Sequence, residues 1–147
     1  MTAWTTFFAA ALGVWAMTTD AMARSPERPL VLVECRLGPT TDDALCRAMI
    51  RAISDLATSG AIVRQADDSA TLGPSDLGVT FVLDSRDAMG ISGHLEWRAG
   101  PDEARHSGPV LRLDVVDAVL SPAMYPNFAR SLLQVDPDLS ARLRSSF

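Results

Sequence analysis

The stretch LVLVECRLGPTTDDALCRAMIRAISDLATSG, residues 30–60, decides the fold of this chain. Residues 30–37 predict a strand, and its first half is apolar on both faces, which favours a central strand covered on both sides at that end. Gly38 and Pro39 end the strand, and the apolar pattern changes to helical spacing over residues 41–59. The stretch therefore predicts a strand, a tight turn and a helix, in that order.

The predicted helix is amphipathic. Its apolar residues recur at spacings of three and four and form one broad stripe: Leu45, Cys46, Met49, Ile50, Ile53, Leu56 and Ala57. Thr40 and Asp43 have the spacing of a capping box, although Asp replaces the usual Glu, and Gly60 is the expected C-cap. The charged residues opposite the stripe form an i, i+4 ladder that we expect to face solvent: Asp43, Arg47, Arg51 and Asp55.

Both cysteines of the chain lie in this stretch. Cys35 falls on the same face of the strand as Val31 and Val33, and Cys46 falls on the apolar stripe of the helix, so both thiols should face one interior. In an exported chain, two such cysteines predict one disulfide. Buried free thiols are the alternative. A catalytic dithiol fits less well, because many more residues separate the cysteines than the two of a C-x-x-C motif.

A second strand is predicted over residues 61–65. A helix connects it to the first strand, so the two strands should be parallel and joined by a right-handed β-α-β crossover. Residues 66–78 (ADDSATLGPSDLG) are polar and rich in turn formers, which predicts a mobile surface loop.

The chain then changes to strict alternation of apolar and polar residues, which is typical of an antiparallel sheet with one covered and one solvated face. Strands are predicted over 79–84, 91–98 and 110–116, with a turn over 85–90 and a loop over 99–109 between them. The inward-facing residues are expected to be Val79, Phe81, Leu83, Ile91, Gly93, Leu95, Trp97, Leu111, Leu113 and Val115.

Short helices are predicted after the last strand. Ser121-Pro122 is a typical pair of N-cap and first helical residue, and a helix is expected over 126–135. Asp136-Pro137 begins a last short helix that carries Leu139 and Leu143 on its apolar side.

The expected fold class is α+β: a two-layer sandwich in which a mixed sheet of about five strands has its helices packed on one face. The elements follow the order β-α-β-β-β-α, and residues 30–147 should form this single domain. The order is similar to the topology of several small periplasmic modules of secretion and envelope-assembly machines, but no residue motif identifies a family.

The first residues predict a targeting signal, not a part of the fold. Residues 7–17 (FFAAALGVWAM) are an uncharged apolar run that suits a signal-peptide core and is too short to span a bilayer. Small residues precede the junction of Ala23 and Arg24, so we expect cleavage there, after a signal peptide of residues 1–23. The lack of Lys and Arg before the run departs from the usual pattern, and a buried helix or an uncleaved anchor is the alternative. Residues 24–29 should be a loose leader.

Composition excludes several classes of function. The net charge is −5 at pH 7 with scattered charges, so nucleic acid and anionic membranes are poor partners. All 13 basic residues are arginine, which excludes a lysine nucleophile or Schiff base. No P-loop, calcium loop or dinucleotide fingerprint occurs, so no cofactor is expected. No second long apolar segment follows the leader, so no membrane insertion of the mature chain is expected, and the predicted location is periplasmic or extracellular.

His94, Glu96 and His106 are weak candidates for a metal site. His94 and Glu96 share one face of a predicted strand, and His106 lies on the loop that follows. Two histidines and a carboxylate are ligands found in catalytic zinc sites, but this spacing matches no zinc motif. An exposed histidine on a solvated sheet face is the simpler interpretation.

No catalytic residue is assigned. Ser92 lies in the sequence GISGH, but a nucleophile elbow requires G-x-S-x-G between a strand and a helix, and here the second glycine comes one residue early in mid-strand. Paired carboxylates can hydrolyse glycosides when their environments differ, but in polar turns all should stay ionised. The carboxylates in these turns are Asp84, Asp87, Asp102 and Glu103.

Three aromatic residues beyond the leader are candidates for a binding surface: Trp97, Tyr125 and Phe128. Trp97 is in phase with Ile91 and Leu95, which favours a place in the core beside Phe81. Tyr125 and Phe128 should close the following helix onto the sheet.

The leading hypothesis from the sequence is an exported, non-enzymatic module with a protein or an envelope component as its partner. The second is a small-molecule or metal-binding protein that uses the polar sheet face around His94, Glu96 and His106. A small hydrolase ranks last.

Overall fold

The computed structural model describes residues 28–39, 42–58 and 60–145. The predicted signal peptide, its cleavage site, most of the leader and Thr40 lie outside these ranges. The elements are β1 (Leu30–Arg36), α1 (Asp43–Leu56), β2 (Ile62–Gln65), β3 (Leu77–Arg86), β4 (Gly90–Ala99), β5 (His106–Ser107), β6 (Leu111–Asp114), the 3-10 turn η1 (Pro122–Met124), α2 (Tyr125–Gln134) and α3 (Pro137–Arg144). Among the described residues, the helices are too short or too polar to cross a bilayer.

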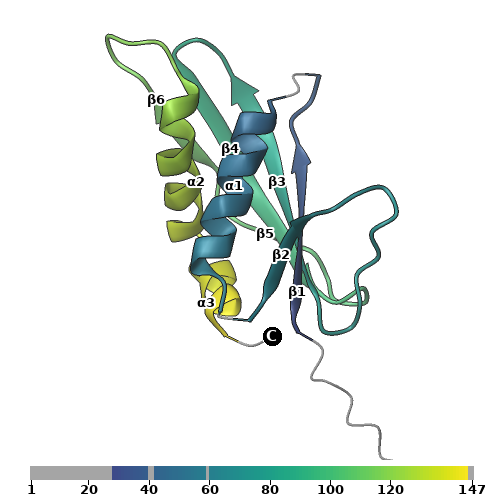
Figure 1. Cartoon of the computed structure of the whole chain (residues 1–147). Helices are drawn as coiled ribbons and strands as arrows, with labels where there is room; N and C mark the ends of the chain where they lie inside the picture. The colour runs from purple at the N-terminus through teal and green to yellow at the C-terminus, as the bar shows by residue number, and fades with distance from the viewer. Residues whose placement is uncertain (1–27, 40–41, 59, 146–147) are drawn as a thin grey trace, which may run out of the picture.

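The strands form one open mixed sheet, and the helices pack on one of its faces (Figure 1), which confirms the predicted α+β fold. The sheet order is β2-β1-β3-β4, and both β5 and β6 pair with the outer side of β4. β1 is parallel to both β2 and β3, whereas β4 is antiparallel to β3. The predicted antiparallel meander over 79–84, 91–98 and 110–116 is present as β3, β4 and β6, and β3 also joins β1 in a parallel pair.

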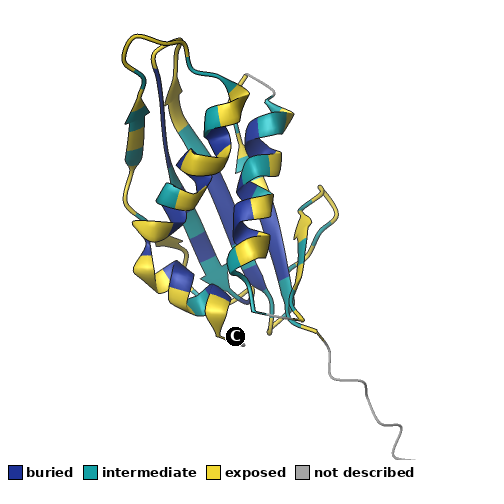
Figure 2. Ribbon diagram, turned by 60° about the vertical axis from the view of Figure 1, so that its left-hand side comes forward, coloured by how far each residue is buried: buried dark blue, intermediate teal, exposed yellow. Residues whose placement is uncertain are grey.

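The core lies between the sheet and the helices (Figure 2). Alternate residues of β1, β3 and β4 face the helices, as the alternation predicted, and Phe81 meets Phe128 of α2 edge to face with ring centroids 6.2 Å apart. A Cβ atom on Gly93 would lie 2.7 Å from the ring of Phe81, so only glycine fits there. Trp97, Tyr125 and Phe128 are all buried, as predicted.

The ends of α1 differ from the prediction. Asp42, not Thr40, is the N-cap: its Oδ1 accepts hydrogen bonds from the backbone N–H groups of Ala44 at 3.1 Å and Leu45 at 3.3 Å. The helix ends at Leu56 with Ala57 as its C-cap, before Gly60. The chain leaves the helix early because the N–H of Thr58 donates to the carbonyl of Leu143 at 2.8 Å instead of continuing the helix.

The predicted disulfide is present. Cys35 of β1 and Cys46 of α1 are bonded, and their Cα atoms are 5.9 Å apart. Closing a loop of this length stabilises the folded state by about 3 kcal/mol in the chain-entropy description. The bond joins the central strand to the first helix of the other layer.

The segment between β2 and β3, predicted as a mobile surface loop, packs on the face of the sheet opposite the helices. Leu72 lies so close to β3 that a Cβ atom on Gly78 would be 3.2 Å from its Cδ1. Leu32, at 4% exposure, is buried on that same face. The loop is tied at its end, since Asp76 accepts a backbone hydrogen bond from Gly100 at 2.8 Å. This cover accounts for a first strand that is apolar on both faces.

β3 contains a bulge that the alternation did not predict. Leu83 lies opposite Gly93, but Ser85 lies opposite Ser92 and Arg86 opposite Ile91. One extra residue therefore shifts the phase of the strand, and Arg86 turns to the helix face. The strand continues to Arg86, beyond its predicted end at residue 84.

The last two strands also differ from the prediction. The predicted loop over 99–109 contains the two-residue strand β5, which pairs with β4. β6 is shorter than the predicted 110–116, and Val110 and Val116, which lie beyond its two ends, are 63% and 80% exposed.

Candidate functional site

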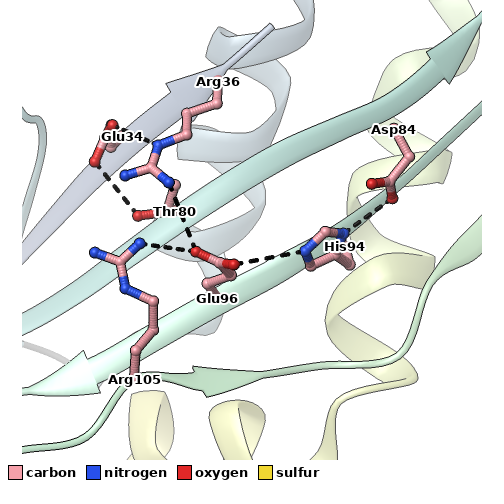
Figure 3. Close-up of polar contacts among 7 residues, drawn as sticks. All are labelled: Glu34, Arg36, Thr80, Asp84, His94, Glu96 and Arg105. Carbon is pink, nitrogen blue, oxygen red and sulfur yellow. Dashed lines mark hydrogen bonds and ion pairs between the residues drawn. The ribbon is translucent and has the colours of Figure 1, made fainter.

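On the face of the sheet away from the helices, beside the part that the segment between β2 and β3 covers, polar side chains form one connected group, which we call the sheet-face network (Figure 3). They project from three neighbouring strands and from the segment before β5, on the side away from the helices. The members of the network are Glu34, Arg36, Thr80, Asp84, His94, Glu96 and Arg105.

Glu96 is the centre of the network. Its Oε2 accepts a hydrogen bond from Arg105 Nη1 at 2.8 Å and lies 3.8 Å from Arg36 Nη1, while its Oε1 lies 3.8 Å from His94 Nε2. The hydrogen bond from Arg105 holds the pKa of Glu96 below its usual value, against the effect of partial burial. Glu96 is therefore a carboxylate whose charge is already shared by its neighbours.

The side chains at the two ends of the network also have polar partners. The Nδ1 atom of His94 lies 2.9 Å from Asp84 Oδ2. At the other end, Arg36 Nε donates to Glu34 Oε1 at 2.9 Å. Each of the residues Glu34, Arg36, Glu96 and Arg105 thus has a partner of opposite charge within the network, and Asp84 is hydrogen-bonded to His94.

The structure does not bring the three metal candidates together. His94 and Glu96 lie side by side as predicted, but His106 pairs with Trp97 across β5 and β4. Its ring stacks on Trp97 with centroids 4.3 Å apart, on the helix face of the sheet. In residues 28–39, 42–58 and 60–145, no group of three His, Cys, Asp or Glu side chains could hold a metal ion.

The hydrolase candidates are each engaged elsewhere. Ser92 is 7% exposed, and its hydroxyl lies 2.6 Å from that of Ser85. Asp87 accepts from the N–H of Met89 at 2.7 Å in the turn before β4. Glu103 accepts from the N–H of Ala99 at 3.2 Å. Asp84 belongs to the network, and Asp102 is exposed.

A second polar cluster joins the layers and was missed by sequence reasoning. The hydroxyl of Tyr125 donates to Asp42 Oδ2 at 2.8 Å, and Arg86 hydrogen bonds to the same oxygen. The Arg86 guanidinium also lies over the Tyr125 ring, 5.4 Å from its centroid. The only signal in the sequence was that a buried tyrosine hydroxyl needs a partner.

The electrostatics of this cluster favour a charged Asp42. Burial alone would raise the pKa of Asp42, but the hydrogen bonds from Tyr125 and Arg86 outweigh it and hold that pKa below its usual value. Burial, together with the hydrogen bond to Asp42, raises the pKa of Tyr125. The cluster therefore keeps one negative charge at the start of α1, where the helix dipole also favours it.

The outer surface of the helix layer carries a groove between α1 and α2, which Figure 2 shows side by side. It consists of two hollows, of about 190 and 290 Å³, which share Ala52, Asp55 and Arg130. Apolar side chains contribute to its lining: Ala48, Ala52, Leu56 and Leu133. Three exposed arginines line it as well: Arg51, Arg130 and Arg144.

The groove arginines differ from those of the network. Within the described part of the chain, ion pairs involve Arg36, Arg86, Arg105, Arg112 and Arg142, and none involves a groove arginine. Asp55 is the one carboxylate among the lining residues described. The groove is thus a positively charged concave surface with an apolar floor.

The sequence matches no protein-family model and no curated protein sequence.

Proposed function

We propose that this protein is an exported, non-enzymatic binding module whose α1/α2 groove receives an acidic segment of a partner protein. The observation that carries the proposal is the arginine set of the groove. Arg51, Arg130 and Arg144 surround an apolar floor and have no carboxylate partner within ion-pair distance in the described chain.

The composition of the groove favours a protein segment. Arginine is enriched at protein interfaces because its planar guanidinium binds carboxylates with two hydrogen bonds and packs on apolar surfaces. Ala48 and Ala52 are small, so the backbone of a bound segment can approach α1 closely. An acidic segment with a few small apolar side chains would complement both features.

Export is supported by the predicted signal peptide and by the disulfide between Cys35 and Cys46, because structural disulfides persist in oxidising compartments. The partner is therefore proposed to be periplasmic, extracellular or exposed on the envelope.

Site-specific photo-crosslinking in intact cells tests this proposal. A crosslinking residue at Gln134, which lines the groove, should capture a protein, whereas one at Arg64, exposed on β2, should not. The double substitution Arg51→Glu and Arg130→Glu should abolish the adduct at position 134.

Arg47→Glu is the matched control for these substitutions. Arg47 lies one turn from Arg51 on α1, is exposed, and does not line the groove. An adduct that is lost equally with Arg47→Glu, or that forms equally at position 64, would show that the groove is not the binding site.

A further inference from the structure

β6 leaves one edge of the sheet unpaired. It forms the rim of the ribbon in Figure 2, and in the described chain its only strand partner is β4. The N–H of Val115 donates to the carbonyl of Met89 on the β4 side at 2.7 Å. Hydrogen-bonding direction alternates along an antiparallel strand, so Leu111 and Leu113 also direct their backbone groups to β4. Arg112 and Asp114 therefore direct their N–H and C=O groups outward.

The sequence around β6 is complementary to itself when read in the opposite direction. Residues 110–116 are VLRLDVV, and Leu113 is their centre. In an antiparallel pair centred there, Arg112 of one copy lies opposite Asp114 of the other. The next positions outward pair Leu111 with Val115, and then Val110 with Val116.

We propose that β6 pairs with β6 of a second copy of this chain, antiparallel across a two-fold axis at Leu113, so that the two sheets become one. Such an interface is isologous, which is the commonest symmetry of soluble oligomers. It is independent of the α1/α2 groove, which lies on the helix layer.

The charges select the register. Only residues whose backbone N–H and C=O groups point away from β4 can form hydrogen bonds across the new pair, so these residues must lie opposite each other. A change to the next possible register therefore moves the partner of each residue by two positions. The two registers adjacent to the central one place Arg112 opposite Arg112 or Asp114 opposite Asp114, and like charges directly opposite are destabilising. In the central register, the contact of Arg112 Nε with Asp114 Oδ1 at 2.7 Å within each copy becomes part of a square of four alternating charges.

Burial favours the same pairing. Val110 and Val116 are 63% and 80% exposed, and they flank the free edge. In the dimer each valine lies opposite the other, which removes apolar surface from water. A contact through a strand this short buries less surface area than a permanent interface does. The fraction of the protein that is dimeric should therefore depend on its concentration.

Charge reversal and restoration test the pairing. Sedimentation velocity over a concentration series should show a monomer–dimer equilibrium for the native sequence. Arg112→Asp alone, or Asp114→Arg alone, places like charges opposite each other twice and should raise the dimer dissociation constant by at least about tenfold. The double substitution Arg112→Asp and Asp114→Arg should restore dimerisation.

Arg36→Glu is the matched control, because Arg36 and Glu34 form the same i, i+2 ion pair with nearly the same exposure, but on the central strand β1. It should leave the dimer unchanged. A native protein that stays monomeric throughout, or a double variant that stays monomeric while folded by circular dichroism, would overturn the proposal.

Oxidative crosslinking tests the register. Both native cysteines are in the disulfide, so one added cysteine is the only free thiol. Leu113→Cys places two thiols at the axis, at a non-hydrogen-bonded position where side chains are closest, and should give a disulfide-linked dimer. Arg112→Cys places the two thiols diagonally, too far apart for this bond. Crosslinking of the second variant but not the first would contradict the register, and crosslinking of neither would contradict the pairing.

Discussion

The sheet-face network and the α1/α2 groove contain the same basic residue in two different conditions. Arg36 and Arg105 on the sheet face each lie within 4.0 Å of a carboxylate. Arg51 and Arg130 in the groove line a concave surface without such a contact in the described chain. The difference indicates that the fold already uses the charges of the sheet face, whereas those of the groove remain available to a partner.

The geometry of the two layers explains the difference. On a sheet, residues two apart along a strand and residues on neighbouring strands lie about 5–7 Å apart, so opposite charges meet directly. Arg36 thereby reaches both Glu34 on its own strand and Glu96 two strands away. The groove arginines come from three separate helices, and their neighbours across the groove are mostly apolar.

The largest loss of stability is expected from a substitution at Asp42, whose carboxylate binds Arg86. The side chain of Arg86 is the least exposed among the arginines that form ion pairs in the described chain. Asp42→Ala removes the cap of α1 and leaves Arg86 and the Tyr125 hydroxyl without their acceptor. We expect the free energy of unfolding to fall by about 2–3 kcal/mol. Urea unfolding measures this, with the exposed neighbour Asp43→Ala as control, for which a change of about 0.5 kcal/mol is expected. Equal losses in both variants would contradict the role of the cluster.

Glu96→Gln should have the next largest effect. It removes the carboxylate charge that Arg36, Arg105 and His94 share. Because these pairs are partly solvated, we expect a loss of about 1 kcal/mol in urea unfolding. Asp102→Asn, an exposed carboxylate in the loop before β5, is the control and should change little. If Glu96→Gln left the free energy of unfolding unchanged, the network would add no stability.

The pH dependence of stability should follow from the same two carboxylates. The folded-state pKa values of Asp42 and Glu96 lie below their usual values of about 4, so their contribution is fully present above that range and is lost as pH falls through the folded pKa. The melting temperature should therefore fall on acidification. Asp42→Asn should show a smaller fall between about pH 5 and about pH 2 than the native protein. An unchanged slope would contradict the assignment to Asp42.

The smallest effect on stability is expected in the groove. Arg51→Ala, Arg130→Ala and Arg144→Ala remove charges that make no ion pair in the described chain, so each should change the free energy of unfolding by less than about 0.5 kcal/mol. Their effect should instead appear as loss of the crosslink at position 134. A loss of stability above about 1 kcal/mol in any of them would place that arginine among the structural ones.

Much of the fold was predictable because the spacing of apolar residues along the sequence indicates which face of a helix or strand each residue occupies. The stripe from Leu45 to Ile53 and the alternation of Ile91, Leu95 and Trp97 placed both sides of the core, and they placed Cys35 and Cys46 toward one interior. Local chemistry also predicted the start of α3, where Asp136 caps the N–H of Leu139 at 3.0 Å.

Spatial neighbours were less predictable, because periodicity does not state which elements lie beside each other. His106 was grouped with His94, but its place opposite Trp97 puts it on the other face of the sheet. The bond between Asp42 and Tyr125 joins residues 83 apart in the chain, and no local pattern connects them. The groove exists only because α1 packs beside α2. This packing brings together the apolar residues of its floor and the arginines that line it.

The bulge in β3 marks a position where the chain can lose one residue without changing the faces of its neighbours. A substitution at Asp84 changes one contact, to His94. A deletion there would remove the extra residue and would still leave Ser85 opposite Ser92 and Arg86 opposite Ile91, so that Arg86 would keep its contacts with Asp42 and Tyr125. Relatives of this protein should therefore tolerate many residues at position 84, and they should also tolerate the loss of that residue, because a regular strand keeps Arg86 on the helix face.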